Sequence, residues 1–171
     1  KKYDLAFTDV SKGLELFPDY SPAHRLKANI YLALHQYQES LAEYTQAIQL
    51  DENEPEFYYD RSKLYYLHLK DLTKALQDIN KALQINPFYP PHHDLAAEIY
   101  LALENFEKSL YHRNQLLYLV QKFHPSQQTH YQSIIEKSKT QILELNKSYP
   151  NLQNSSFATT PKIPQPINPV D

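Results

Sequence analysis

The stretch Ile30-Tyr-Leu-Ala-Leu-His-Gln-Tyr-Gln-Glu-Ser-Leu41 returns 69 residues later as Ile99-Tyr-Leu-Ala-Leu-Glu-Asn-Phe-Glu-Lys-Ser-Leu110. A further copy lies between the two, because Tyr31, Tyr65 and Tyr100 are spaced by 34 and 35 residues. Self-similarity at such a period is typical of repeat proteins, in which each copy is one supersecondary unit stacked on the next. The sequence therefore predicts a repeat architecture.

Small residues follow the same period in two columns. The columns are Ala6, Ser40, Ala75 and Ser109, and then Gly13, Ala47, Ala82 and, departing from the pattern, Leu116. One step in each column is 35 residues instead of 34. We therefore expect one additional residue between Tyr65 and Ala75, in the turn near His68 and Leu69.

Each copy contains two helical patterns joined by a short polar turn. In residues 21–34 and 38–50 the apolar and small residues recur at intervals of three and four, as they do in amphipathic helices. Proline is tolerated at the first position of a helix and cannot continue a helix past its end. The prolines at the expected starts are Pro22, Pro55 and Pro91, and those after the expected ends are Pro18 and Pro87.

These features resemble the tetratricopeptide repeat, a helical hairpin of 34 residues in which small residues let two antiparallel helices approach closely. The pattern falls on His24, Ala28, Tyr31, Ser40, Tyr44 and Ala47, then on Tyr58, Ser62, Tyr65, Ala75, Ile79, Ala82 and Pro87, and then on His93, Ala97, Tyr100, Ser109, Arg113 and Leu116. Arg113 replaces an aromatic residue and Leu116 a small one. We therefore expect the packing of that second helix to loosen or to change partner.

The resemblance covers roughly residues 3–123 and implies an all-α, right-handed superhelix. We predict the second helix of an incomplete repeat over 1–20, repeats over 21–54 and 55–89, a degenerate repeat over 90–123, a capping helix over 124–149 and a disordered Pro-rich tail over 150–171. A capping helix is expected because the last repeat of a solenoid exposes an apolar face. The tail, with two Pro-x-x-Pro spacings, is interpreted as a linker or as a ligand for a polyproline-binding domain.

Composition excludes several classes of function. Lys and Arg number 17 against 20 Asp and Glu, so we expect no nucleic-acid partner. The absence of Cys removes thiolate sites, and a single Gly cannot form a Gly-rich phosphate loop. Because no apolar run approaches the roughly 18 residues that span a bilayer, we expect no membrane insertion in this segment.

We accordingly predict that the segment is not an enzyme and holds no cofactor. It begins in mid-repeat and without Met, so we expect it to be a piece of a longer protein. A cytoplasmic location is favoured, and the lack of Cys is equally compatible with the periplasm. We expect no metal site at His92 and His93, since adjacent residues of a helix point about 100° apart.

The resemblance implies that a peptide of a partner protein binds in a concave groove lined by the first helix of each repeat. The groove positions fall on Arg25, Asn29, Tyr59, Asp60, Lys63, Tyr66, Asp94 and Glu98. Tyr59 and Tyr66 are expected to anchor the peptide, because aromatic side chains often carry much of the binding energy at interfaces. The charges, from Arg25 to Asp94 and Glu98, are expected to orient a peptide that has an acidic and a basic end.

Other interpretations stay open. The groove residues could be ordinary solvated helix faces, or the segment could recruit partners to a larger enzyme assembly such as a ubiquitin ligase. A third alternative is a structural solenoid that associates with another copy through the open edge of residues 3–18. Binding of acidic chaperone tails is not favoured, because Asp60 stands at an Asn position of the family's carboxylate clamp, and Pro91 and Leu95 replace two basic residues.

Overall fold

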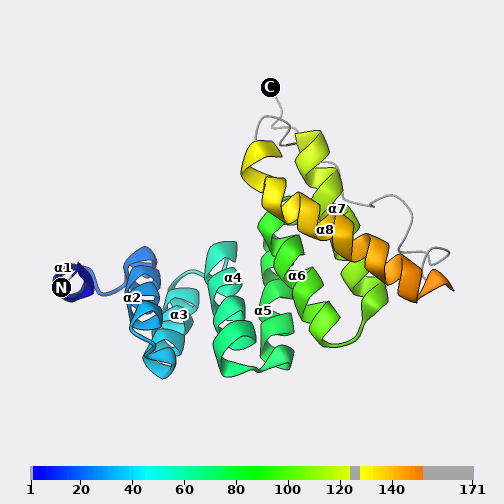
Figure 1. The fold of residues 1–171 in the computed structure, drawn as a ribbon. Coiled ribbons are helices and arrows are strands. Elements are labelled where there is room, and N and C mark those ends of the chain that lie inside the picture. Colours follow the sequence, from blue (N-terminus) through cyan, green and yellow to red (C-terminus); the bar gives the residue numbers. More distant parts are fainter. Residues whose placement is uncertain (1, 124–127, 152–171) are drawn as a thin grey trace. The chain divides into compact units, whose positions relative to one another are not determined.

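The computed structural model of this protein describes residues 2–123 and 128–151 (Figure 1). The elements in chain order are α1 (Lys2–Leu16), α2 (Ser21–Ala33), α3 (Tyr37–Leu50), α4 (Pro55–Leu64), η1 (Tyr65–Leu69), α5 (Leu72–Ile85), α6 (Pro90–Ala102), α7 (Phe106–Phe123) and α8 (Gln128–Ser148). These described ranges contain helices and no strand, which confirms the all-α prediction. The first residues of the predicted capping helix, 124–127, and the predicted tail from residue 152 onward lie outside the described residues.

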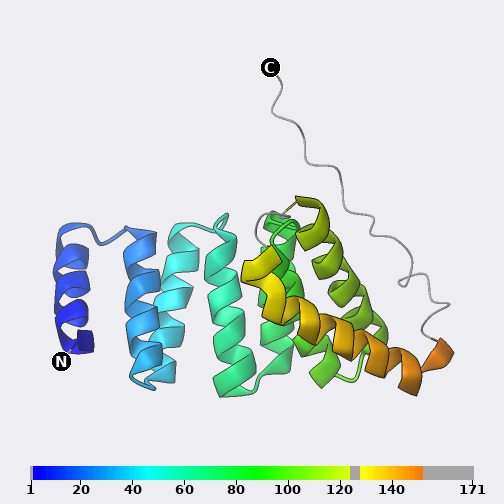
Figure 2. The same cartoon turned by 45° about the horizontal axis from the view of Figure 1, so that its top comes forward.

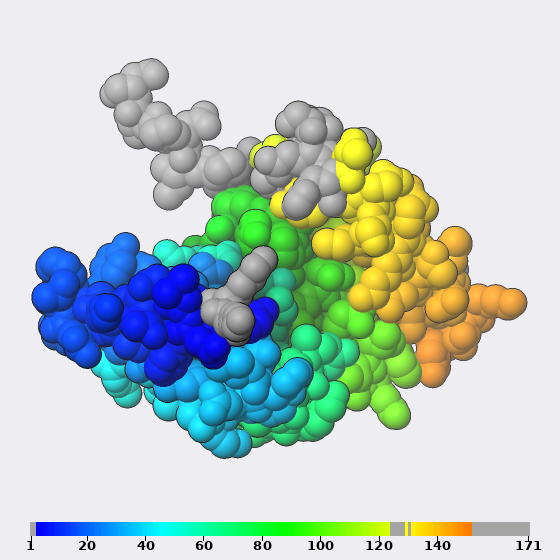
Figure 3. Space-filling model, turned by 60° about the vertical axis from the view of Figure 1, so that its left-hand side comes forward, coloured from blue at the N-terminus to red at the C-terminus, as the bar shows by residue number. Residues whose placement is uncertain are grey.

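The helices form two compact units, Lys1–Asn86 and Pro87–Asp171. In the first unit, α1 and two helical hairpins stand side by side (Figures 1 and 2). The hairpins are α2 with α3 and α4 with α5, and further contacts join α1 to α2 and α3 to α4. Figure 3 looks toward α1, whose dark blue residues form the near surface of this unit.

One Ala and one Ser face each other within every hairpin. The hydroxyl of Ser40 in α3 donates to the backbone carbonyl of Ala28 in α2, at 2.9 Å. The equivalent bonds run from Ser62 to Ala75 (2.7 Å) and from Ser109 to Ala97 (2.9 Å). All six residues are at most 1% exposed, so each hydroxyl needs a partner inside the protein. Side chains this small let the helix backbones approach until the hydroxyl reaches a carbonyl of the neighbouring helix.

The additional residue of the middle copy lies in a π-helical turn. Here the N–H of Asp71 donates to the carbonyl of Tyr65, six residues earlier, at 3.1 Å. The other two hairpins close the same turn with bonds that span five residues, from Gln36 to Tyr31 and from Asn105 to Tyr100. The wider turn therefore accommodates the insertion without changing the helices on either side.

The core of the first unit joins three helices. Ala28, Tyr44 and Leu64 form a buried cluster, at most 1% exposed, with one residue from each of α2, α3 and α4. Partly buried apolar side chains surround it, namely Leu32, Tyr37, Leu41 and Leu69. Because the cluster includes residues of two hairpins, it fixes α4 against the preceding one.

The second unit contains the α6/α7 hairpin and α8, which runs obliquely across α7 (Figures 1 and 2). Leu116 of α7 is fully buried in a cluster with Val120 and with Tyr131 of α8. The second helix of this hairpin thus acquires a new partner where the repeat pattern departs from a small residue. The packing there does not loosen.

Two histidines form a buried pair in this unit. Nε2 of His93 donates to the carbonyl of Pro87 at 3.0 Å, so Nδ1 of the neutral ring accepts from Nδ1 of His112, also at 3.0 Å. Burial lowers the pKa of His93 to about 4. Burial, together with the nearby His93, lowers the pKa of His112 to about 3. Both rings are therefore neutral in the folded protein at neutral pH.

We expect the free energy of unfolding to fall on acidification. Above about pH 6.5 the rings are neutral in both states, whereas below it the unfolded chain binds protons that the folded pair does not, which costs about 2 kcal/mol per histidine between roughly pH 7 and 5. His112→Phe should flatten this decline in urea unfolding followed by circular dichroism. His68→Gln, which changes an exposed histidine, should leave it unchanged. Equal slopes for wild type and His112→Phe would contradict the assignment.

Candidate functional site

The predicted groove residues of the first unit lie on α2, α4 and η1. Arg25 and Asn29 lie on α2. The next helix, α4, begins at Pro55, and the side chain of Glu54 caps it by accepting a hydrogen bond from the N–H of Glu56 at 3.3 Å. This start sets the register that places the remaining predicted residues of this unit, Tyr59, Asp60 and Lys63 on α4 and Tyr66 on η1.

Arg25 binds to two carboxylates of α4. Its Nε donates to Oδ2 of Asp60 at 2.6 Å, and its Nη2 donates to Oε2 of Glu56 at 3.4 Å. Burial raises the pKa of Asp60, although the hydrogen bond and the charge of Arg25 act against this increase. The positive charge predicted for this end of the groove is therefore compensated within the protein. An acidic peptide gains little from it.

Asn29 is held by the second helix of its own hairpin. The hydroxyl of Tyr44 donates to Oδ1 of Asn29. Tyr44 is 1% exposed, and burial raises the pKa of its hydroxyl, which keeps the donor protonated. The bond fixes the amide oxygen and leaves the amide nitrogen of this exposed residue to donate to a ligand.

The two predicted anchors, Tyr59 and Tyr66, are both half-buried. The ammonium of Lys63 lies 5.4 Å from the ring centroid of Tyr59, one helical turn earlier, in a cation–π contact. This contact holds part of the Lys63 stem along the helix. Tyr66 lies in the π-helical turn, so its position depends on the additional residue.

A hollow of about 360 Å³ lies beside Arg25 and Asn29. Its lining includes Leu26, which is 52% exposed, and further residues that the sequence analysis did not select. Those further residues are Ser21, Pro22, Asp51, Glu54, Glu56 and Phe57. The signal for the acidic members was the run Asp-Glu-Asn-Glu-Pro-Glu at 51–56. It was missed because the resemblance supplied positions on the first helices only.

Asp94 and Glu98 belong to the second unit, where both bind Arg113 of α7. The side chain of Arg113 is fully buried. In the repeat register Arg113 stands at the position of Tyr44 and Glu98 at that of Asn29, so the same cross-helix contact is made by an ion pair.

The helix α8 adds to the partners of Glu98. Its residues Lys137 (3.2 Å) and Gln141 (3.3 Å) reach the same carboxylate oxygen, Oε1. The predicted charges of this unit are therefore compensated internally, as Arg25 is in the first unit. The predicted gradient from Arg25 to Asp94 joins residues of both units and stays a prediction.

Two further observations limit the chemistry of the described residues. Among residues 2–123 and 128–151, no group of three or more His, Asp or Glu side chains is arranged to hold a metal ion. Nor does any helix within these ranges have the length and apolarity needed to cross a membrane.

The hairpins and their register define a helical repeat protein. Residues 28–68 match the family model described as TPR repeat, and residues 55–89 match the one described as tetratricopeptide repeat. The chain belongs to the tetratricopeptide repeat family. The family predicted from the spacing of the tyrosines and small residues is thereby confirmed.

A curated relative from Dictyostelium discoideum, named DnaJ homolog subfamily C member 3 homolog, is 33% identical over 99 residues. The match covers 55% of this chain and 19% of that protein, so the chain spans about a fifth of the length of its relative.

Solved structures share the fold. The first TPR of Spaghetti (RPAP3), bound to the HSP90 peptide SRMEEVD, has a TM-score of 0.62 at 19% identity, over 75% of this chain and 91% of that one. The TPR2B domain of yeast Sti1, in a pHsp70 complex, has 0.64 at 14% identity, over 75% and 97%. MamA has 0.65 at 13% identity, over 90% and 92%. These similarities confirm the predicted tetratricopeptide repeat fold.

We expect Arg113→Met to lower the free energy of unfolding by about 3 kcal/mol, because it leaves Asp94 and Glu98 close together without their shared cation. Lys137→Met is the matched control. It removes an exposed partner of Glu98, and such pairs contribute about 0–1 kcal/mol. Urea unfolding at constant pH measures both changes. A loss no larger for Arg113→Met than for Lys137→Met would show that the buried pair does not stabilise this unit.

Proposed function

We propose that this chain is a non-catalytic protein-interaction scaffold, which binds a peptide segment of a partner protein along α2, α4 and η1. The observation that carries the proposal is the hollow of about 360 Å³ beside Arg25 and Asn29, whose lining residues come from two successive repeats. A surface of this kind is concave and combines apolar with hydrogen-bonding groups, as peptide sites do. The partner is proposed to lie across the faces of both first helices.

The predicted residues take distinct roles in this proposal. Tyr59 and Tyr66 provide half-exposed aromatic surface, which suits them to anchor an apolar side chain. Asn29 donates through its amide nitrogen to a peptide carbonyl. Lys63 and Asp60 with its partner Arg25 set the orientation of the peptide by charge, and we propose that Asp94 and Glu98 do so for any part that reaches the second unit.

The comparisons support peptide binding as the general activity. Two proteins with this fold are described as bound to an HSP90 peptide and as part of a pHsp70 complex. The chemistry of the present site differs from a clamp for acidic tails, because Asp60 occupies an Asn position of that clamp and binds Arg25. We therefore propose a different peptide class for this chain.

A second candidate is a recruiting module within a larger assembly. The length of the Dictyostelium relative, of which this chain spans 19%, favours this alternative. Self-association through α1 is a third candidate, since Tyr3 is 51% and Leu5 66% exposed. Light scattering over a concentration series distinguishes it, because a persistent monomer rejects self-stacking.

We expect the combined variant Tyr59→Ala, Lys63→Glu, Tyr66→Ala to lose partner binding, because it removes both aromatic anchors and reverses one charge of the proposed groove. The measurement is crosslinking and affinity capture from native extract, with circular dichroism to show that the variant stays folded. The control variant, Gln38→Ala, Glu39→Lys, changes exposed residues of α3. Partners retained by the groove variant but lost by the control would move the site to the α3 face.

A further inference from the structure

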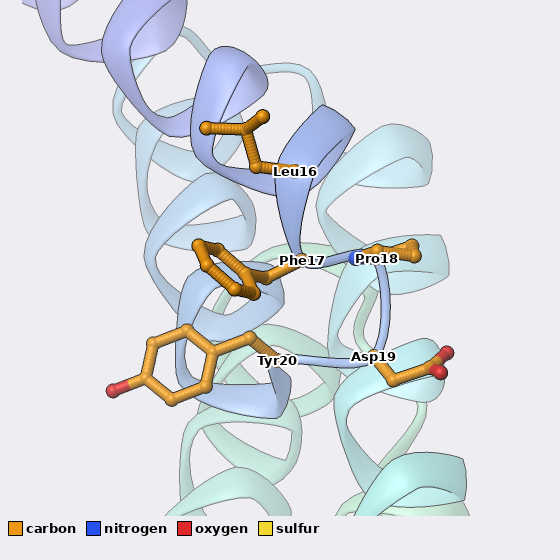
Figure 4. Close-up of a pocket in the computed structure, with 5 residues that line it drawn as sticks. All are labelled: Leu16, Phe17, Pro18, Asp19 and Tyr20. Atoms are coloured by element: carbon orange, nitrogen blue, oxygen red, sulfur yellow. The ribbon is translucent and has the colours of Figure 1, made fainter.

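Three large apolar side chains are exposed at the turn between α1 and α2. Leu16 is 75%, Phe17 68% and Tyr20 59% exposed. Together with Pro18 and Asp19 they line a hollow of about 600 Å³. Figure 4 shows these three side chains pointing to the same side of the chain, and Asp19 pointing to the opposite side. We call this the apolar hollow.

The repeat register relates the apolar hollow to the hollow beside Arg25. Phe17 and Tyr20 stand 34 residues before Asp51 and Glu54, which line that second hollow. The same two positions of the turn are thus aromatic in one copy and acidic in the next. The two hollows adjoin at the start of α2, because Tyr20 lines the first and the next residue, Ser21, lines the second.

The second hollow, which we call the acidic hollow, has an excess of negative charge. Three carboxylates line it, from Asp51, Glu54 and Glu56, with Arg25 as the one cation of its lining. Arg25 is already bound to Asp60 outside this lining. Asp51 and Glu54 form no ion pair within the part of the chain that the structure describes. Their carboxylates accept only local backbone hydrogen bonds there, which leaves their charge uncompensated.

Resting on the proposed function, we infer that the two hollows bind one extended cationic segment of a partner protein. A large apolar residue of this segment occupies the apolar hollow, and a Lys or Arg a few residues away occupies the acidic hollow. Burial of apolar surface supplies affinity, and the complementary charges supply orientation and selectivity against acidic segments.

Charge also argues against a second copy of this chain as the occupant. The first unit contains 10 Lys and Arg and 13 Asp and Glu, a net charge of 10 − 13 = −3. Two copies that met through this surface would bring like charges together. A cationic segment relieves the same excess of charge.

The test is selection of random displayed peptides on the intact chain, after depletion on the Tyr59→Ala, Lys63→Glu, Tyr66→Ala variant. Recovered peptides are synthesised with a fluorescent label and measured by anisotropy. We expect peptides in which a Leu, Phe or Trp is followed or preceded within a few residues by Lys or Arg. Their affinity should fall with added salt, because the contact is in part electrostatic.

Two variants separate the hollows. Asp51→Asn with Glu54→Gln removes two charges while keeping hydrogen-bond acceptors for the turn and the cap, and Phe17→Ser removes the exposed ring. Each should weaken binding about tenfold or more. The control, Asp9→Asn with Glu39→Gln, removes the same charge from exposed positions of α1 and α3 and should change affinity less than about twofold.

The outcomes distinguish this inference from the proposed function. Recovery of acidic or uncharged peptides overturns the inference and leaves groove binding standing. Failure to enrich any peptide over the groove variant overturns both. A concentration-dependent dimer that Phe17→Ser abolishes, without peptide enrichment, assigns the apolar hollow to a second copy and also overturns the inference.

Discussion

The close approach of two helices at a single Ala and Ser is the contact on which the rest of this structure depends. Each Ser hydroxyl reaches a backbone carbonyl of the neighbouring helix, and this happens in all three hairpins of the described chain, once with the direction reversed. A larger side chain at either position would separate the backbones and leave a buried hydroxyl without its acceptor. The hairpin geometry in turn decides which residues of the first helices face a ligand.

One backbone register carries three different chemistries. The position that reaches from the second helix back to the first is Tyr44 in one copy, Ile79 in the next and Arg113 in the third. Tyr44 gives a hydrogen bond to Asn29, whereas Arg113 gives an ion pair with Glu98, which α8 then extends through Lys137. The repeat therefore fixes where side chains meet, and the side chains decide what each copy can bind.

Spacing alone predicted the hairpins and even the location of the additional residue, because a period is visible in one sequence. It did not predict that this residue would form a π-helical turn, since several turn types can accommodate one residue. The pairing of Arg25 with Asp60 was also beyond it, because the register aligns equivalent residues but does not reveal contacts between copies. For the same reason Phe17 and Tyr20 were taken as turn residues, although their polar counterpart Asp51 marks the position as unusual.

The most direct test of this account is the free energy of unfolding of Ala28→Leu compared with Ala42→Leu. Both add the same atoms to a helix of the same hairpin, but Ala28 is fully buried against Ser40 and Ala42 is exposed. The account predicts a loss of about 2–3 kcal/mol for Ala28→Leu and a change within about 0.5 kcal/mol for Ala42→Leu, measured by urea unfolding. Equal, small changes would show that the hairpin does not depend on close approach at this pair.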